Sequence, residues 1–563
     1  MRKKMQMVVV KNSDVKKNYE QKLYIDEQFP NLLQVLQENK LSVLHICNGN
    51  GTCGKCKIKL VSGNLPITET DKRILSKEEL DQGTRLACKV KTKDIFEMNA
   101  DNELVLELME ENEENIVVET IEIIENTKQD SITDKQTEKK YFVAIDIGTT
   151  TIAMALVDEE TGEVCNTYTS LNHQRKYGAD VLSRISAANS GKAEELKRLI
   201  EDDLWKGVYK LICSVDENNI NSDIDKNGEV LTNIRKISRL VICGNTTMIH
   251  LFMGYSCEFL GKYPFHSEYL AGIEDTFKGI PFTILPGIST FVGSDVMAGI
   301  LVCPGFETEK INLLIDLGTN GEMVLGNNEK ILVASTAAGP AFEGGNIICG
   351  MASVPGSICQ VKIQKQRAVV KTIQNELPPK GICGTGLISA VAKLLENHLL
   401  DEQGLLKMPY QKAGYPLWTF ENGEKIAVYQ QDIREFQMAK SAIRAGIDIL
   451  LEEYGCTASE IEHIYLAGGF GTNLSWEKAI ITGILPKEFS AKIKCMGNLA
   501  LKGTVLTGRE KAKEAAKGCF GKSNKYSTDK KIKEIVKRTQ NISLAENCLF
   551  HEKYMEYLNF SVL

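Results

Sequence analysis

Four cysteines near the start of the chain have the spacing of metal ligands. Cys47, Cys53 and Cys56 form a C-x5-C-x2-C pattern in a loop with three glycines, and Cys88 follows much later. Glycines let the backbone of such a loop wrap closely around a small inorganic core. Three thiolates from one loop and one from a distant strand can bind a [2Fe–2S] cluster. The sequence therefore predicts that these four cysteines are cluster ligands.

A structural zinc site is the alternative for the same cysteines. Zinc is often bound by four thiolates, and such sites usually offer two C-x2-C pairs. This chain has one such pair, so the glycine-rich loop and the x5 spacing favour iron and sulfide. The stretch resembles the plant- and adrenodoxin-type ferredoxins, a β-grasp domain of about this length. Within that resemblance, the four cysteines match all four cluster ligands.

Two short motifs further along the chain suggest a second kind of chemistry. Asp146-Ile-Gly-Thr-Thr150 and Asp316-Leu-Gly-Thr-Asn320 each follow one apolar run and precede another. A strand, a tight Gly-Thr turn and a second strand make a hairpin whose backbone N–H groups can face a phosphate. Two such hairpins suggest a duplicated fold that grips one nucleotide from both sides. We call residues 146–150 the first phosphate hairpin and residues 316–320 the second.

The residue types in both hairpins fit ATP bound with Mg²⁺. Carboxylates can hold the water shell of the metal, and backbone N–H groups and threonine hydroxyls can hold the phosphates. Asp146 and Asp316 are therefore the candidates for the metal shell. The chain has no Walker-type loop and no Rossmann fingerprint after a strand, which disfavours those nucleotide folds. The candidate phosphate contacts are Gly148, Thr149, Thr150, Gly318, Thr319 and Asn320.

Further elements occur in the order expected of the acetate/sugar kinase, heat-shock-70 and actin superfamily. Asp295 lies about twenty residues before the second phosphate hairpin, where this resemblance places an acidic connecting helix. It is the candidate for orienting the attacking water, and the alternative is an ordinary helix N-cap. Residues 497–503 should open a second connecting helix.

The adenosine end of the nucleotide has its own candidates. Gly468, Gly469 and Phe470 follow an apolar strand and match the superfamily's adenosine loop, whose glycines allow close approach to a flat base. A long amphipathic helix is expected over residues 432–453, with Asp432 as its cap. Its Lys440 could reach the ribose or adenine, and the alternative is a solvated face.

Length and composition limit the number of domains and the kinds of partner that this chain can have. A chain of 563 residues is too long for one core, and a net charge of −7 argues against a broad nucleic-acid surface. No run approaches the ~18 apolar residues of a membrane helix, and the basic start lacks a signal-peptide core. We therefore expect a cytoplasmic protein that binds neither membrane nor nucleic acid.

The domain boundaries follow from a change in composition. Residues 103–125 are rich in glutamate and lack lysine and arginine, and residues 126–140 are polar without apolar periodicity. Such a stretch cannot bury enough surface to fold alone, so it is either a tether that lets the cluster domain swing or a passive spacer. The predicted units are a ferredoxin-like domain (1–106), a linker (107–140), a first ATPase lobe (141–305) and a second lobe with a C-terminal tail (306–563).

Over nearly its whole length the chain resembles the ATP-dependent reductive activators of corrinoid proteins. Besides the cysteines and both hairpins, the resemblance rests on Gly244-Asn-Thr-Thr-Met248, Ala338-Gly-Pro-Ala-Phe-Glu343, Gly384-Thr-Gly386, Asp432-Ile-Arg434 and Ala467-Gly-Gly-Phe470. It implies an α/β multidomain fold, with a β-grasp [2Fe–2S] domain, a linker and a two-lobed actin-like (ribonuclease H-like) ATPase. It also implies one-electron reduction of Co(II) corrinoid proteins of methyltransferase systems to Co(I), an external low-potential donor (ferredoxin or reductase) and a homodimer.

Three other functions remain open at this point. An activator of radical acyl-CoA dehydratases or reductases shares the kinase-like fold, but the family resemblance there implies a [4Fe–4S] cluster shared between two subunits, without a separate ferredoxin domain. A small-molecule kinase with a fused redox sensor would transfer phosphoryl groups to a soluble substrate. A non-catalytic redox-sensing module would bind ATP with negligible hydrolysis.

Overall fold

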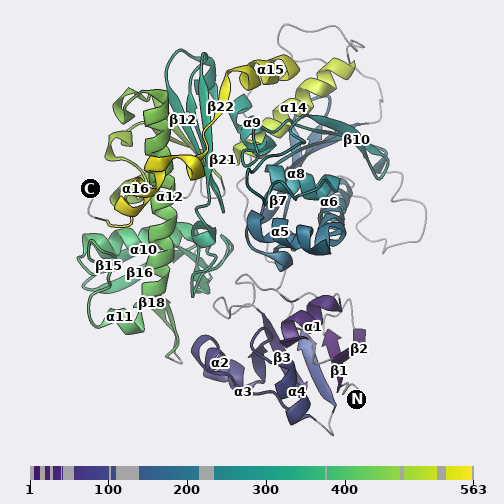
Figure 1. Cartoon of the computed structure of the whole chain (residues 1–563), viewed down its shortest axis with the longest axis vertical. Coiled ribbons are helices and arrows are strands. Elements are labelled where there is room, and N and C mark those ends of the chain that lie inside the picture. Colours follow the sequence, from purple (N-terminus) through teal and green to yellow (C-terminus); the bar gives the residue numbers. More distant parts are fainter. Residues whose placement is uncertain are drawn as a thin grey trace.

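In the described residues of the computed structural model there are five β-sheets, and the three largest each anchor one body (Figure 1). None of the helices in the described parts of the chain combines the length and hydropathy that a membrane-spanning helix requires. The structure describes residues 6–12, 19–25, 29–39, 41, 43, 56–99, 103–108, 139–214, 234–374, 377–421, 423–468, 475–516 and 528–560.

The N-terminal domain is a five-stranded mixed sheet in the order β2-β1-β5-β3-β4. The sequence predicts two paired strands at residues 6–10 and 20–26 and a helix over residues 31–39, and the structure confirms both. That helix buries one leucine-rich face in the core of the domain. The elements are β1 (Gln6–Asn12), β2 (Tyr19–Ile25), α1 (Leu32–Glu38), β3 (Lys57–Ser62), α2 (Glu69–Ile74), α3 (Lys77–Asp81), β4 (Thr84–Leu86), α4 (Thr92–Met98) and β5 (Leu104–Leu108).

The strand β5 pairs in parallel with β1 and runs to Leu108, past the predicted boundary at residue 106. Most of the predicted linker, including the short strand suggested at residues 116–118, lies outside the described residues.

The first lobe is a six-stranded sheet in the order β10-β11-β9-β6-β7-β8. Its central strand β6 pairs antiparallel with β7 and parallel with β9, and β7 pairs antiparallel with β8. The elements are β6 (Tyr141–Ile147), β7 (Thr151–Asp158), β8 (Val164–Leu171), α5 (Val181–Ala187), α6 (Ala193–Cys213), β9 (Ile237–Gly244), α8 (Thr246–Met253), β10 (Ile273–Phe277), β11 (Ile280–Ile284) and α9 (Ser294–Val302).

The second lobe repeats this arrangement in the order β21-β20-β12-β13-β14-β22. Its central strand β12 is antiparallel to β13 and parallel to β20, as β6 is to β7 and β9. The main elements are β12 (Asn312–Leu317), β13 (Gly321–Gly326), β14 (Ile331–Thr336), α10 (Gly384–Glu396), α12 (Gln430–Tyr454), β20 (His463–Ala467), α13 (Trp476–Ile481), β21 (Ile493–Gly497), α14 (Leu499–Ala516), α15 (Thr528–Arg538), β22 (Thr539–Asn541) and α16 (Cys548–Glu556).

The burial of the two central strands shows the duplication directly. In each, a run of buried residues leads to a half-buried aspartate, after which buried and partly exposed positions alternate into the turn. The predicted duplicated fold is therefore confirmed. Smaller additions to the second lobe are β15 (Ser357–Gln364), β16 (Arg367–Thr372), β17 (Gly381–Ile382), α11 (Tyr410–Ala413), β18 (Tyr415–Thr419) and β19 (Lys425–Val428).

Two helix starts differ from expectation. Helix α12 begins at Gln430 with Tyr429 as N-cap, and Asp432 occupies the third position, where its carboxylate accepts the Tyr429 N–H at 2.8 Å. The apolar run at residues 387–395 predicts a helix there, but the observed helix α10 begins earlier, at Gly384, and continues through Gly386. A Cβ at Gly386 would lie 1.9 Å from the Ile358 carbonyl, so this glycine serves close packing on β15 rather than a turn.

The connecting helices α9 and α14 join the two lobes (Figure 1). By sequence α14 belongs to the second lobe, yet it packs on β6 and β9 of the first. A Cβ at Gly508 would lie 2.2 Å from the ring of Phe142, and one at Gly503 would lie 2.0 Å from the Ala298 carbonyl of α9. The backbones of the two helices therefore touch where the lobes meet.

We expect Gly503→Ala to lower the thermal stability of the ATPase lobes. The new methyl group must push α14 away from the α9 backbone, and overpacking of this kind costs about 1–3 kcal/mol. Gly299→Ala on the facing helix is the matched control, because its Cβ would meet only ordinary contacts at 3.5 Å or more. Thermal unfolding of both variants tests this, and equal melting temperatures would contradict the packing argument.

Candidate functional site

The β3–β4 ladder brings together two of the four predicted cluster ligands. Cys56 directly precedes β3, and Cys88 lies just beyond β4. Lys57 pairs with Leu86 across the ladder, and the Ala87 N–H donates to the Cys56 carbonyl at 2.8 Å. The two cysteines, far apart in the sequence, are therefore neighbours at one end of the sheet.

The surroundings of this cysteine pair fit an iron–sulfur centre. Cys56 is 1% exposed and Cys88 is 5% exposed, and both belong to the apolar core of the domain. Helix α1 covers this end, since the Leu33 N–H donates to the Ala87 carbonyl. Two buried thiols from separate segments suit a cluster bound by Cys thiolates. Cys47 and Cys53 lie outside the described residues.

The two phosphate hairpins, one from each lobe, contact each other. The Thr150 Oγ1 of the first and the Thr319 Oγ1 of the second are 3.3 Å apart. Both hydroxyls donate to Oε2 of Glu343, each at 2.5 Å. Glu343 ends a short 3-10 helix, η5 (Pro340–Glu343), in the glycine-rich loop after β14. The structure therefore brings the predicted phosphate contacts Thr150 and Thr319 to one point.

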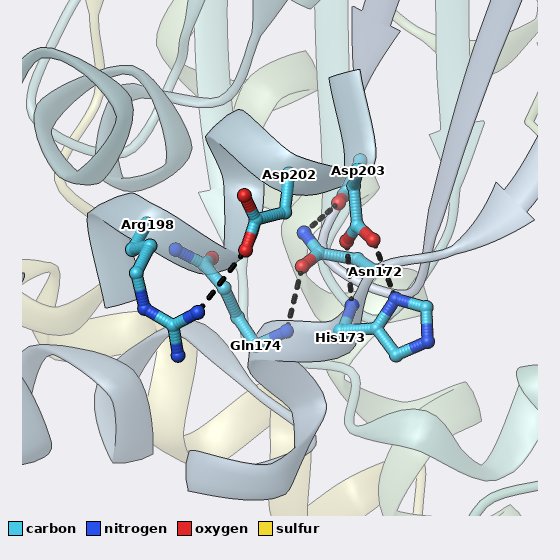
Figure 2. A network of polar contacts seen from close by, with 7 residues as sticks. Asn172, His173, Gln174, Arg198, Asp202 and Asp203 are labelled. Atoms are coloured by element: carbon cyan, nitrogen blue, oxygen red, sulfur yellow. Dashed lines mark hydrogen bonds and ion pairs between the residues drawn. The ribbon is translucent and has the colours of Figure 1, made fainter. Parts of the chain in front are cut away.

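The first phosphate hairpin is held from behind by a polar framework. Asn172 donates from its amide to the Gly148 carbonyl and from its backbone to the Thr150 carbonyl, each at 2.9 Å. Figure 2 shows that Asn172 lies beside the His173–Asp203 pair, whose Nδ1 and Oδ1 atoms are 2.5 Å apart. These hydrogen bonds hold the backbone of the turn.

Two further side chains hold the Thr149 residue of the same hairpin. The Asn245 amide, at the N-cap of α8, donates to Thr149 Oγ1 at 2.9 Å. The Arg184 guanidinium, which is fully buried, donates to the Thr149 carbonyl at 2.6 Å and to the Gly178 carbonyl at 3.1 Å. Burial lowers the pKa of Arg184 to about 9. No ion pair between Arg184 and a carboxylate occurs among the described residues.

Carboxylates gather in front of the hairpins. Burial raises the pKa of Asp146 to about 6, although Asn498 of the second lobe donates to its Oδ2 at 2.9 Å. Burial and the neighbouring acidic groups raise the pKa of Asp316 and of Asp295 to about 7. The same causes raise the pKa of Glu322 well above its usual range. A site this rich in buried negative charge is chemically matched to a cation.

The cation would not be held by protein side chains alone. Within the described ranges, no three acidic, histidine or cysteine side chains converge as ligands of one ion. Mg²⁺ usually keeps several waters and is bound through one or two carboxylates plus substrate phosphates. The donor set around Asp146 and Asp316 therefore fits Mg²⁺ that arrives with a nucleotide.

Asp295 lies in the first turn of α9. The N-cap of this helix is Gly293, without a side-chain cap, so the alternative that Asp295 is an N-cap is wrong. The start of α9 is tied to the end of β9 because Ser294 Oγ bonds both the N–H and the carbonyl of Gly244. Burial first, and then the charge of Asp146, raises the pKa of Asp295 to about 7.

The predicted adenosine contacts are only partly described. Gly468 follows β20 with a φ of +95°, and a Cβ there would lie 2.6 Å from Asp316 Oδ1. A glycine is thus required where this loop passes the second hairpin. Gly469 and Phe470 lie outside the described residues.

Lys440 contacts the C-terminal tail. Its Nζ donates to the carbonyls of Tyr557 at 2.5 Å and Asn559 at 2.8 Å, and it lies 4.9 Å from the centre of the Phe560 ring. The residue is 1% exposed, so it is not a solvated side chain either. Burial lowers the pKa of Lys440 to about 7. We therefore leave Lys440 out of the nucleotide site and assign it to anchoring the C-terminal tail on α12.

Sequence reasoning missed several residues of the site. Glu343 and Asn245 stood in motifs that had been singled out, but no role was attached to them. Asn498 opens the predicted second connecting helix and gave no further signal. Arg184 had no signal at all, because an arginine in a helical pattern is typical of a solvated face.

We expect Arg184→Met to weaken ATP binding by about tenfold, the equivalent of ~1.4 kcal/mol. The change removes a desolvated positive charge behind the first hairpin and leaves the Thr149 carbonyl without its donor. Titration calorimetry with Mg-ATP measures the effect. Arg184→Lys keeps the charge and should lose less, and equal losses in both variants would mean that the charge is not what matters.

Three family profiles match the chain in order. The 2Fe-2S iron-sulfur cluster binding domain matches residues 17–93, and the RACo middle region matches residues 141–306. The C-terminal domain of RACo, the ASKHA domain, matches residues 310–562. The order of the three profiles agrees with the three bodies of the structure.

Individual proteins agree with the profiles. The chain is 33% identical over 405 residues to the corrinoid activation enzyme RamQ of Eubacterium limosum, covering 67% of this chain and 66% of that protein. It is 27% identical over 399 residues to the [Co(II) methylated amine-specific corrinoid protein] reductase of Methanosarcina barkeri, covering 64% and 68%. The chain thus spans about two thirds of the length of these relatives.

A solved structure of similar fold covers the whole molecule. It is a reductive activator for corrinoid, iron-sulfur protein, with a TM-score of 0.63, 24% identity and 98% coverage of both chains. At this identity the match supports the fold, which includes both the ferredoxin-like domain and the two lobes.

Proposed function

Because the chain belongs to the family of RACo-type reductive activators of corrinoid proteins, we propose that it returns the cobalt of a corrinoid protein from Co(II) to Co(I). One electron passes from an external low-potential donor, through the N-terminal domain, to the cobalt, and ATP hydrolysis drives the cycle. The corrinoid protein belongs to a methyltransferase system. The observation that best supports this proposal is that one chain contains both a buried cysteine pair and two phosphate hairpins that contact each other.

ATP is needed because the transfer is uphill. Co(II)/Co(I) lies lower than a ferredoxin-like cluster, whose potential is about −400 mV. Each ~100 mV uphill costs about 2.3 kcal/mol per electron. ATP binding and hydrolysis offset this cost by favouring a complex in which the cobalt is more easily reduced.

In the N-terminal domain, we infer that Cys47, Cys53, Cys56 and Cys88 hold a [2Fe–2S] cluster, which supplies a carrier for one electron. The neighbouring positions of Cys56 and Cys88 support this ligand set. Their burial keeps water from the sulfur atoms and favours a centre of low potential set by its surroundings.

In the ATPase lobes, the residues have separate tasks. Thr150 and Thr319 bind phosphate oxygens, together with the backbone of both hairpins, and Asp146 and Asp316 hold the water shell of Mg²⁺. Asp295 orients the attacking water and accepts its proton at the carboxylate, as a pKa of about 7 allows near neutral pH. The products are ADP and phosphate. The remaining nucleotide contacts are Gly148, Thr149, Gly318, Asn320, Gly468, Gly469 and Phe470.

We further infer a cytoplasmic homodimer. The proposal requires no nucleic acid and no membrane.

A reconstitution with and without ATP tests the proposal. The purified holoprotein, its cobalamin-containing partner captured from reduced lysate, and a donor of ordinary potential are mixed, and Co(I) is followed by absorbance. We expect repeated recovery of Co(I) only with Mg-ATP, and about two iron atoms per chain, the content of a [2Fe–2S] cluster. Equal recovery without ATP, or zinc in place of iron, would refute the proposal.

A further inference from the structure

The carboxylate of Glu343 lies at the point where the two phosphate hairpins meet. Its Oε2 accepts hydrogen bonds from Thr150 of one lobe and Thr319 of the other, both at 2.5 Å. A Cβ at Gly318 would be 3.6 Å from its other oxygen, Oε1, so both oxygens lie close to the hairpins. One acidic side chain thus bridges the two lobes.

The position is chemically that of a phosphate. An ionised carboxylate is an acceptor-only anion, and phosphate oxygens are the ligands that hairpin hydroxyls of this kind bind. Further acidic side chains belong to the same site: burial first, then Asp295 and Asp146, and last Glu343 raise the pKa of Asp316 to about 7. The two threonine hydroxyls are the hydrogen-bond donors that face this carboxylate.

The main chain around Glu343 is firmly held. Phe342 is buried and contacts Phe436 of α12 edge-to-face, with ring centres 5.7 Å apart. On the other side, Gly344 has a φ of +77°, and a Cβ there would lie 2.3 Å from the Met351 carbonyl. Because the backbone on both sides of Glu343 is fixed, the carboxylate would leave the two hydroxyls by rotation of its side chain rather than by movement of the backbone.

We propose that Glu343 occupies the place of the γ-phosphate in the nucleotide-free protein and thereby sets the discrimination between ATP and ADP. This inference rests on the proposed function, which places ATP at the hairpins. The γ-phosphate of ATP must displace the carboxylate from Thr150 and Thr319. ADP has no γ-phosphate and leaves the carboxylate in place. After hydrolysis and phosphate release, the carboxylate returns to the hydroxyls.

Glu343→Gln in the full-length holoprotein tests the proposal. The amide has the same shape and retains an acceptor oxygen, but it lacks the charge that competes with phosphate. The variant is titrated with Mg-ADP and with a non-hydrolysable Mg-ATP analogue. Compared with wild type, it should bind the analogue about tenfold more tightly, and its affinity for ADP should change by less than about threefold. A tenfold change in affinity corresponds to about 1.4 kcal/mol, so the difference between the two nucleotides can be measured.

Glu435→Gln is the matched control for the loss of one negative charge. Glu435 lies on α12 in the same lobe, near the same loop, and bonds Asn346 rather than a hairpin. It should leave the affinities for both nucleotides unchanged. Glu343→Asp retains the charge but is too short to reach both hydroxyls, so it should also favour the ATP analogue if Glu343→Gln does not fold.

The outcomes separate this inference from the proposed function. If the wild-type protein binds neither nucleotide, the proposed function itself is wrong. If it binds both, but the Glu343 variants shift the two affinities equally or weaken binding of the ATP analogue, Glu343 does not stand in for the γ-phosphate.

Discussion

Cys88→Ser should yield a folded protein that retains less than about one tenth of the wild-type iron and acid-labile sulfide, since Cys thiolates are the ligands such clusters require. Cys88 is 5% exposed, so neither water nor another side chain can readily replace its sulfur. Electron delivery to the corrinoid protein should therefore fall to background, at least ~100-fold below wild type. Iron and sulfide analysis, the visible spectrum and the rate of Co(I) formation measure these effects.

Cys257→Ser is the control for this variant. Cys257 is also buried, at 3% exposure, and burial raises its pKa to about 11, which keeps it a thiol. Cys257 lies in the core of the first lobe, so the cluster content and electron transfer of the Cys257→Ser variant should match those of wild type. Basal ATP hydrolysis should survive in Cys88→Ser because the hairpins are in other bodies of the molecule. A full cluster in Cys88→Ser would refute the ligand assignment.

Asp316→Asn should reduce ATP hydrolysis by about 100-fold, which corresponds to roughly 3 kcal/mol of transition-state stabilisation by the metal site. The amide keeps the shape of the side chain but removes the charge that we assign to the water shell of Mg²⁺. Phosphate release at saturating Mg-ATP measures the loss. Because reductive activation depends on hydrolysis, Co(I) recovery should fall with it. Wild-type hydrolysis in Asp316→Asn would remove the second hairpin from the catalytic site.

The same substitution should stabilise the nucleotide-free protein. Asp316 has a pKa of about 7 in the folded chain, compared with about 4 when unfolded. A carboxyl group with a raised folded pKa contributes stability that is fully present below the unfolded value and lost as the pH rises through about 7. Above neutral pH, Asp316→Asn should therefore raise the melting temperature by about 2 °C, and this gain should shrink as the pH falls below about 7 and vanish below about pH 4. A lower melting temperature at pH 8 would contradict the argument.

Much of the architecture could be predicted because its signals are local. The cysteine spacing depends on a single loop, and each phosphate hairpin depends on a strand, a turn and a strand that are contiguous in the chain. For that reason β6 and β7, and likewise β12 and β13, were expected near their observed positions. Repetition of one local pattern was enough to indicate a duplicated fold.

The boundaries of helices were less predictable, for a physical reason. At α12 the cap is set by Tyr429, while Asp432 also accepts the N–H of Ile348 from a remote loop at 2.8 Å. At α10 the glycines are part of the helix because β15 approaches it closely. In both cases contacts with a distant segment determine where the helix starts. Helix propensity depends only on the local sequence, so it does not include these contacts.

The amino-acid sequence by itself determined which chemistries the chain carries: thiolates spaced for a metal centre, and paired turns suited to phosphate. Only the tertiary structure decided which side chains meet. It placed Glu343 between Thr150 and Thr319, buried Arg184 behind a turn, and committed Lys440 to the C-terminal tail. These contacts join segments far apart in the chain, so they depend on how the lobes and helices pack rather than on any pattern of neighbouring residues.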